Sequence, residues 1–282
     1  MIRKTTAIAA AMALLAAGAG CGSDDDEKAS GGGEPAAPKP TTLAVKISGS
    51  AKKPTVTVPK SVKGGLVTIE LTNEAKGAHG VQLIRGDAAH TPEETLAAGN
   101  AWGQDGKALA AWVKPAGGVG SVEPGETATA TQVLPAGSYI AVDLNTDALA
   151  SFEVTGDGTG EVPSGPATIS AVDYAFESSG LNAGSNEVLF DNKGKEPHFI
   201  AAVPIKAGKT IADVKTFFRT EKGEPPIDEE GGFDTAVIEG GEQQAIELEL
   251  EQGKYALLCL VPDAKGGPPH VVKGMISEAT VR

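Results

Sequence analysis

Four residues of rare types in the second half of the chain form a set whose chemistry suits copper. The sequence holds two cysteines, four histidines and three methionines in 282 residues. Cys259, His270 and Met275 lie within seventeen residues of one another, and His198 precedes them. A thiolate with two imidazoles suits both copper oxidation states, and a long axial thioether tunes the potential. We therefore expect one copper ion, with Met275 as its axial ligand.

Strands must position these side chains. Around 246–251, Ile and Leu alternate with Glu, as in a sheet with one face in a core and one in water. Cys259 ends such an alternating run, His270 and Met275 follow in the next loop, and His198 begins another strand. Many short runs punctuated by Gly, Pro, Asn and Asp predict an all-β chain of two β-sandwiches. Short helical patterns interrupt it at 91–96 and 210–218.

The chain repeats one plan in two halves, 41–155 and 167–282, separated by a Gly-rich linker at 156–166. In both halves an Asn precedes a His by six residues, and a Gly-x-Tyr run leads into the last hairpin. His79 matches His198, but Asp143 stands where the second half has Cys259. Two ligands rarely make a metal site, so we expect the first half to be metal-free. His90, Trp102 and Trp112 are interpreted as loop and core residues.

The run from Asn192 to His198 resembles the first-ligand segment of plastocyanin-type cupredoxins. The segment from Cys259 through His270 to Met275 is similar to the cupredoxin ligand loop, and His-Val-Val-x-Gly-Met is close to the electron-accepting copper loop of copper nitrite reductases. This resemblance covers most of residues 167–282. It implies two tandem Greek-key β-sandwiches of the cupredoxin kind, the first degenerate, and a type 1 copper protein that transfers single electrons.

Three features of the sequence limit the kind of copper site that we expect. Ten residues separate Cys259 from His270, more than in small cupredoxins, which leaves open whether the loop closes over the metal. The second half contains one cysteine, Cys259, which excludes a two-copper centre. Leu258 and Leu260 flank Cys259, where nitrite reductases have a histidine for a catalytic copper. We therefore expect no enzyme activity.

The first residues predict export. Residues 1–20 have a basic start, a short apolar run and small residues before Cys21, and they resemble a bacterial lipoprotein signal, with Gly18 where that motif usually has leucine. Cys21 is then the site of lipid attachment, and 21–40 a disordered tether. We expect an extracytoplasmic protein, anchored to the bacterial cell membrane through the lipid alone. An ordinary secretory signal is the alternative.

The net charge of the chain limits the kinds of binding partner that we expect. The formal net charge of −13 argues against nucleic acid. We expect a monomer with a protein redox partner, and the acidic run at 226–234 is interpreted as a solvated loop. Two other functions use the same residues: copper sequestration or trafficking, and a metal-free interaction module in which Cys259 is a small buried hydrophobe. Copper is favoured because an unpaired thiol outside the cytoplasm is open to oxidation.

Overall fold

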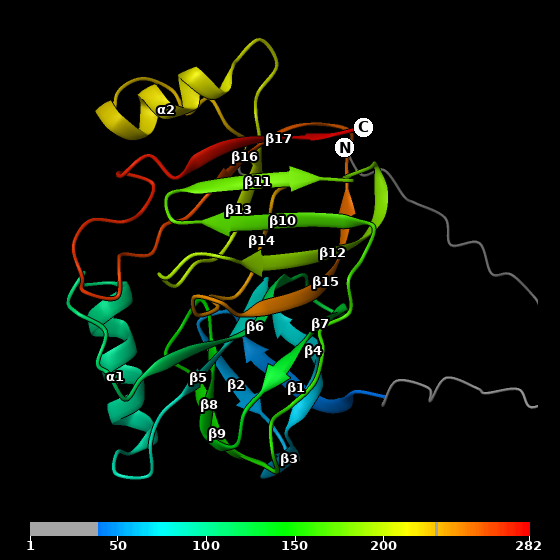
Figure 1. The fold of residues 1–282 in the computed structure, drawn as a ribbon, viewed down its shortest axis with the longest axis vertical. Helices are drawn as coiled ribbons and strands as arrows, with labels where there is room; N and C mark the ends of the chain where they lie inside the picture. Colours follow the sequence, from blue (N-terminus) through cyan, green and yellow to red (C-terminus); the bar gives the residue numbers. More distant parts are fainter. Residues whose placement is uncertain (1–38, 229–230) are drawn as a thin grey trace, which may run out of the picture. The chain divides into compact units, whose positions relative to one another are not determined.

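The computed structural model describes residues 39–228 and 231–282 (Figure 1). The expected signal peptide, Cys21 and all but the last two residues of the expected tether lie outside these ranges. Among the described residues, no helix is long and apolar enough to cross a membrane.

Strands are the predominant regular structure of the described chain and helices are few, which confirms the all-β prediction. The strands of the first half, from the N-terminal end, are β1 (Thr41–Ser50), β2 (Lys53–Thr57), β3 (Ser61–Lys63), β4 (Gly65–Lys76), β5 (His79–Arg85), β6 (Lys114–Val122), β7 (Thr127–Leu134), β8 (Gly137–Asp143) and β9 (Leu149–Thr155). Those of the second half are β10 (Ala167–Val172), β11 (Ala175–Ser179), β12 (Gly184–Asn192), β13 (Ala201–Pro204), β14 (Phe233–Asp234), β15 (Gln243–Leu250), β16 (Gly253–Leu258) and β17 (Ile276–Val281).

The two helices lie where the sequence predicts them. Helix α1 (Pro92–Gly103) begins after Thr91, and α2 (Ile211–Thr220) begins after Thr210. In each, the threonine side chain accepts from the third helical N–H, and an acidic side chain reaches back to the threonine N–H. These capping boxes satisfy N–H groups that have no partner within the helix.

The two halves have matching sheet topologies. In the first half β2-β1-β4-β7 face β9-β8-β5-β6, with β3 added beside β9. In the second half β11-β10-β12-β15 face β17-β16-β13-β14. In both, the first long strand runs parallel to its inner neighbour. The added strand β3 also runs parallel to β9, and the other pairs are antiparallel. The weak sequence repeat therefore reflects one sandwich built twice.

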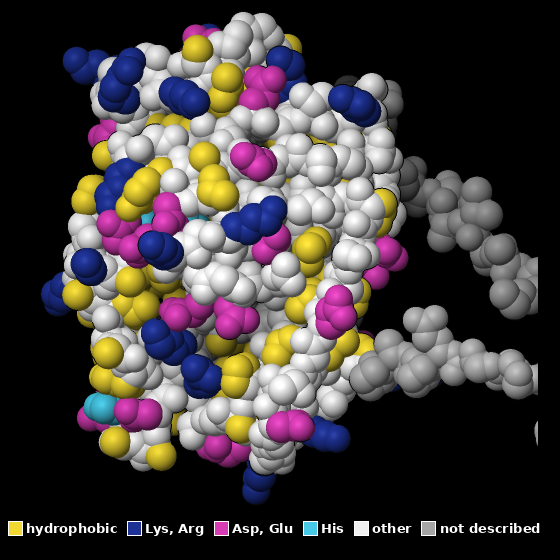
Figure 2. Space-filling view, in the orientation of Figure 1, with side chains coloured by type: hydrophobic (Ala, Val, Ile, Leu, Met, Phe, Trp, Pro, Cys, Tyr) yellow, Lys and Arg dark blue, Asp and Glu magenta, His cyan; other side chains and the backbone are white. Residues whose placement is uncertain are grey.

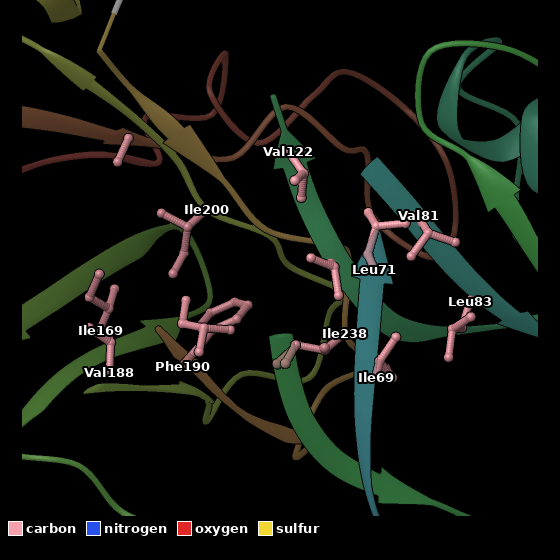
Figure 3. Packing of buried hydrophobic residues seen from close by; sticks show 14 of the residues in the cluster. Ile69, Leu71, Val81, Leu83, Val122, Ile169, Val188, Phe190, Ile200 and Ile238 are labelled. Carbon is pink, nitrogen blue, oxygen red and sulfur yellow. The ribbon is translucent and has the colours of Figure 1, made fainter. Parts of the chain in front are cut away.

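The halves also share a sheet. Strands β7 and β15 pair antiparallel through Gln132–Gln244, Thr131–Ala245 and Ala130–Ile246, which makes one eight-stranded sheet. One buried cluster contains apolar side chains from both halves (Figure 3). In Figure 3, Ile238 lies between Ile69 of the first half and Phe190 of the second. Residues 156–166, the expected linker, carry no helix or strand and connect β9 to β10; the division into domains stays a prediction.

Candidate metal centre

Cys259 directly follows β16, between β13 and β17 in the four-stranded sheet. Its side chain is fully buried in the main core cluster. The approach is braced by Tyr255, whose hydroxyl donates to the carbonyl of Glu251, four residues back, at 3.1 Å. Tyr139 makes the same contact with Pro135 in the first half. The repeated Gly-x-Tyr motif thus fixes the strand that delivers Cys259 in one half and Asp143 in the other.

His198 is held by a turn that Asn192 organises. The Asn192 side-chain amide donates to the carbonyls of Glu196 and Glu239, and its oxygen accepts from the N–H of Gly194. His198 then exchanges two backbone hydrogen bonds with Ile238, at 3.0 and 2.9 Å. Asn192 is fully buried. Asn73 is also fully buried and makes the matching hydrogen bonds in the first half, so the same turn accounts for the Asn-to-His spacing in both halves.

His270 lies at the end of residues 260–269, which we call the ligand loop. Its N–H donates to the carbonyl of Val261 at 2.9 Å, and the N–H of Val271 donates to the carbonyl of Cys259 at 2.8 Å. These bonds fold the loop back so that its two ends meet. The His270 side chain is fully buried.

The structure brings three of the four predicted ligands together. The sulfur of Cys259 lies 3.6 Å from Nδ1 of His198 and 3.4 Å from Nδ1 of His270, and the two nitrogens are 3.1 Å apart. The point equidistant from the three atoms is about 2 Å from each, close to the roughly 2.0 to 2.3 Å of zinc–nitrogen and zinc–sulfur bonds in proteins. Within the described residues, this is the one group of three or more His, Cys, Asp or Glu side chains that could hold a metal.

Each imidazole has a carboxylate on its far side. Nε2 of His198 lies 3.3 Å from Oδ1 of Asp173, and Nε2 of His270 lies 2.9 Å from Oδ1 of Asp263. A neutral imidazole that faces a carboxylate through Nε2 carries its proton there, so both Nδ1 atoms present lone pairs to the sulfur. Neither aspartate was expected from the sequence. Asp263 lies inside the ligand loop and could have been noticed, whereas nothing near Asp173 in the sequence marks it.

The protonation states favour a cation between the three atoms. Burial, and then the charge of His270, lowers the pKa of His198 to about 4, although Asp173 opposes this. Burial also lowers the pKa of His270, against Asp263. Burial raises the pKa of the Cys259 thiol to about 12, despite N–H groups of Phe199 and Val261. The three donor atoms therefore have one proton between them, that of the thiol, in a buried site, and a bound cation would satisfy all three. The residues present thus fit copper.

Met275 is fully buried in the same core cluster as Cys259. Its N–H donates to the carbonyl of His270 at 3.0 Å, which ties its backbone to that ligand. The role of its thioether as axial ligand stays a prediction.

At the matching positions in the first half, a histidine and an aspartate lie within ion-pair distance of each other, and the cysteine is replaced by the aspartate. Nδ1 of His79 lies 2.7 Å from Oδ1 of Asp143, and both side chains are buried. Thr146 donates to the other oxygen of Asp143 at 2.7 Å. The carboxylate therefore takes the place that the Cys259 thiol has in the second half, and its two oxygens already accept hydrogen bonds within the chain.

The ligand loop rests on the first half of the chain. The indole N–H of Trp102 donates to the carbonyl of Asp263 at 2.9 Å, and the N–H of Leu109 donates to the carbonyl of Ala264 at 2.7 Å. In Figure 1 the loop, in red, reaches down to α1. With His270 fully buried, the long loop closes the site. Trp102, interpreted from the sequence as a packing residue, also anchors this loop.

No protein-family model matches the chain, and no curated protein matches it. Among solved structures it is similar to auracyanin B, with 22% identity over 41% of this chain and 86% of that one, at a TM-score of 0.28. It is also similar to auracyanin from the photosynthetic bacterium Roseiflexus castenholzii (20% identity, 41% and 94% coverage, TM-score 0.27). Copper nitrite reductase from Nitrosomonas europaea matches at 13% identity over 86% of this chain and 93% of that one, with a TM-score of 0.23.

Proposed function

We propose that this protein is a type 1 copper protein that transfers single electrons between partners. The observation that carries the proposal is the buried triangle of Cys259 sulfur and two Nδ1 atoms, with both imidazoles oriented by carboxylates. Copper bound there would supply a one-electron couple. A thiolate with two imidazoles is the trigonal set used for copper electron transfer, with Met275 in the axial position.

Burial favours electron transfer over catalysis. A catalytic metal keeps an open position for water or substrate. Here all three donor residues are fully buried, so a substrate would have no access to the metal without movement of the ligand loop. Electrons need no such opening. The histidine that a second copper would require beside Cys259 is replaced by Leu258 and Leu260.

The same burial favours electron transfer over copper trafficking. A trafficking protein must release its metal to a partner, which is easiest when ligands lie at the surface. The ligand loop is instead tied to the first half by Trp102 and Leu109. We therefore propose that bound copper exchanges slowly, at a rate limited by opening of the ligand loop.

The proposal extends to where the protein is located and to the kind of redox partner that it has. We propose that cleavage before Cys21 and lipid attachment there anchor the protein outside the cytoplasm. The redox partner would be a protein. Figure 2 shows acidic, basic and apolar side chains mingled over the face that it draws. On that face, the acidic side chains are not gathered into one patch that could serve as a docking surface.

A copper titration tests this function. Copper(II) is added to a soluble chain that begins after Cys21, and the visible and paramagnetic-resonance spectra are followed. We expect an intense thiolate-to-copper band at one equivalent, absent from Cys259→Ser, and a reversible one-electron couple. A protein that takes up no copper would overturn the proposal and leave a metal-free interaction module. Rapid loss of copper to a chelator, without a reversible couple, would instead favour trafficking.

A further inference from the structure

Asp263 covers the outer side of His270. Its Oδ1 lies 2.9 Å from Nε2 of His270 and also accepts from the hydroxyl of Tyr174 at 3.0 Å, while Oδ2 contacts the ammonium of Lys273. The Tyr174 ring stands edge-on to the His270 ring, with centroids 5.4 Å apart. Asp263 is therefore held by three partners and not free to turn away from the imidazole.

Tyr174 itself is held in an unusual backbone conformation. Its φ of 72° lies in the left-handed region, which costs a non-glycine residue energy and persists only where the surrounding structure enforces it. The turn between β10 and β11 thereby places Tyr174 beside Lys273, whose ammonium lies 5.2 Å from the ring centroid. Asp173, the preceding residue, comes from the same turn.

Asp173 covers the outer side of His198. Its Oδ1 accepts from the N–H groups of Lys195 and Glu196 at 2.9 and 3.2 Å, and it lies 3.3 Å from Nε2 of His198. The carboxylate thus joins the β10–β11 turn to the segment that carries the first histidine. Both candidate histidine ligands therefore have the same outer partner, an aspartate, although the two aspartates lie on different elements.

We propose that Asp173 and Asp263 are positioning residues of the copper site, a step that rests on the proposed function. Each fixes the proton of its imidazole on Nε2, points Nδ1 at the metal and makes the imidazole a stronger donor. Together they add two negative charges beside the site. Because the doubly charged copper ion gains more from these charges than the singly charged one, the pair holds the reduction potential down.

The experiment compares substitutions in the soluble chain that begins after Cys21. Asp263→Asn and Asp173→Asn keep an oxygen that can accept from Nε2 but remove the charge, whereas the alanine variants remove both. Asp191→Asn is the matched control, because Asp191 is similarly covered and accepts from Gln243 without contacting a candidate ligand. Cobalt(II) is the affinity probe, since it does not oxidise the thiol and its thiolate band reports binding. The copper reduction potential is measured on the same set.

We expect each alanine variant to bind cobalt(II) about 10- to 100-fold more weakly than the unsubstituted protein. The asparagine variants should lose less affinity but show a higher copper potential. A tenfold loss of copper(II) affinity at unchanged copper(I) affinity corresponds to about 59 mV. Asp191→Asn should change neither quantity. The potential of the asparagine variants is the decisive measurement, because a merely structural aspartate would not alter it.

Unchanged copper reduction potentials in both asparagine variants would overturn the inference. This test remains valid even if the alanine variants fail to fold. Failure of the proposed function gives a different result, because it is already visible in the unsubstituted protein: that protein would either bind neither cobalt nor copper, or bind copper without a reversible one-electron couple.

Discussion

The indole N–H of Trp102 and the backbone carbonyl of Asp263 form a hydrogen bond of 2.9 Å between residues 161 positions apart. Trp102 belongs to α1 in the first half, and Asp263 to the ligand loop in the second. The half that lacks a full ligand set therefore supports the loop that covers the metal site. This gives the first half a physical role in the site, which a spacer or docking module alone would not have.

Replacing Trp102 tests that support. Trp102→Phe keeps a large ring but removes the N–H donor, so we expect a loss of about 0.5 to 1.5 kcal/mol in the free energy of unfolding. In a chain of this size, that lowers the melting temperature by roughly 2 to 4 °C for each kcal/mol. Bound copper should also transfer to a chelator faster than in the unsubstituted protein. Trp112→Phe is the control, because Trp112 stacks on His90. Equal chelation rates in the two variants would contradict the role of Trp102.

The shared sheet predicts that the second half is not independent. A chain of residues 167–282 would expose the edge of β15, which normally pairs with β7. Unpaired edges promote association between chains. We expect this fragment to aggregate or to elute as an oligomer in size-exclusion chromatography, while residues 41–282 elute as a monomer. A monomeric fragment with the same cobalt(II) affinity as the longer chain would show that the halves fold as separate domains.

The axial position of Met275 can be tested with a variant of similar volume. Met275→Leu should cost less than about 1.5 kcal/mol in the free energy of unfolding, since core substitutions that keep volume are tolerated best. If the thioether is an axial donor, its loss withdraws electron density that favours copper(II), and the reduction potential rises. Cyclic voltammetry measures the change. Leu257→Met is the control for a buried side chain in the same core, on β16. An unchanged potential in Met275→Leu would exclude the axial role.

Burial of His198 predicts how the metal-free protein responds to acid. Its pKa is about 4 in the fold and about 6.5 in the unfolded chain, because burial and the charge of His270 disfavour protonation. Between these values the unfolded state binds more protons. The stabilisation is complete above pH of about 6.5 and is lost as the pH falls towards about 4. Urea titrations should show a slope of at most about 1.4 kcal/mol per pH unit from this group. The slope should flatten in His198→Gln; an unflattened slope would mean that other groups cause it.

Much of this organisation follows from the sequence, but not all of it. Rare residue types identified His198, Cys259 and His270, and the structure brings their donor atoms together. Period-two alternation and short helical patterns predicted strands and helices because these signals are local. Asp173 was missed because it is distant in sequence from His198 and its role depends on a turn, whereas Asp263 lies inside the ligand loop and was within reach of sequence reasoning. The β7–β15 pairing is also non-local, and nothing in the local sequence of either strand indicates which strand it pairs with.

The buried thiol leads to the last prediction, which concerns protons released when metal binds. Burial raises the pKa of Cys259 to about 12, so near neutral pH the thiol of the metal-free protein keeps its proton. Both imidazoles are neutral there, since burial lowers their pKa values. A metal that binds one thiolate and two neutral imidazoles must therefore release about one proton. Calorimetric titration with cobalt(II) in two buffers of different ionisation enthalpy measures this number. Release should fall towards zero in Cys259→Ser, and zero release by the unsubstituted protein would show that the thiol is not a ligand or is already ionised.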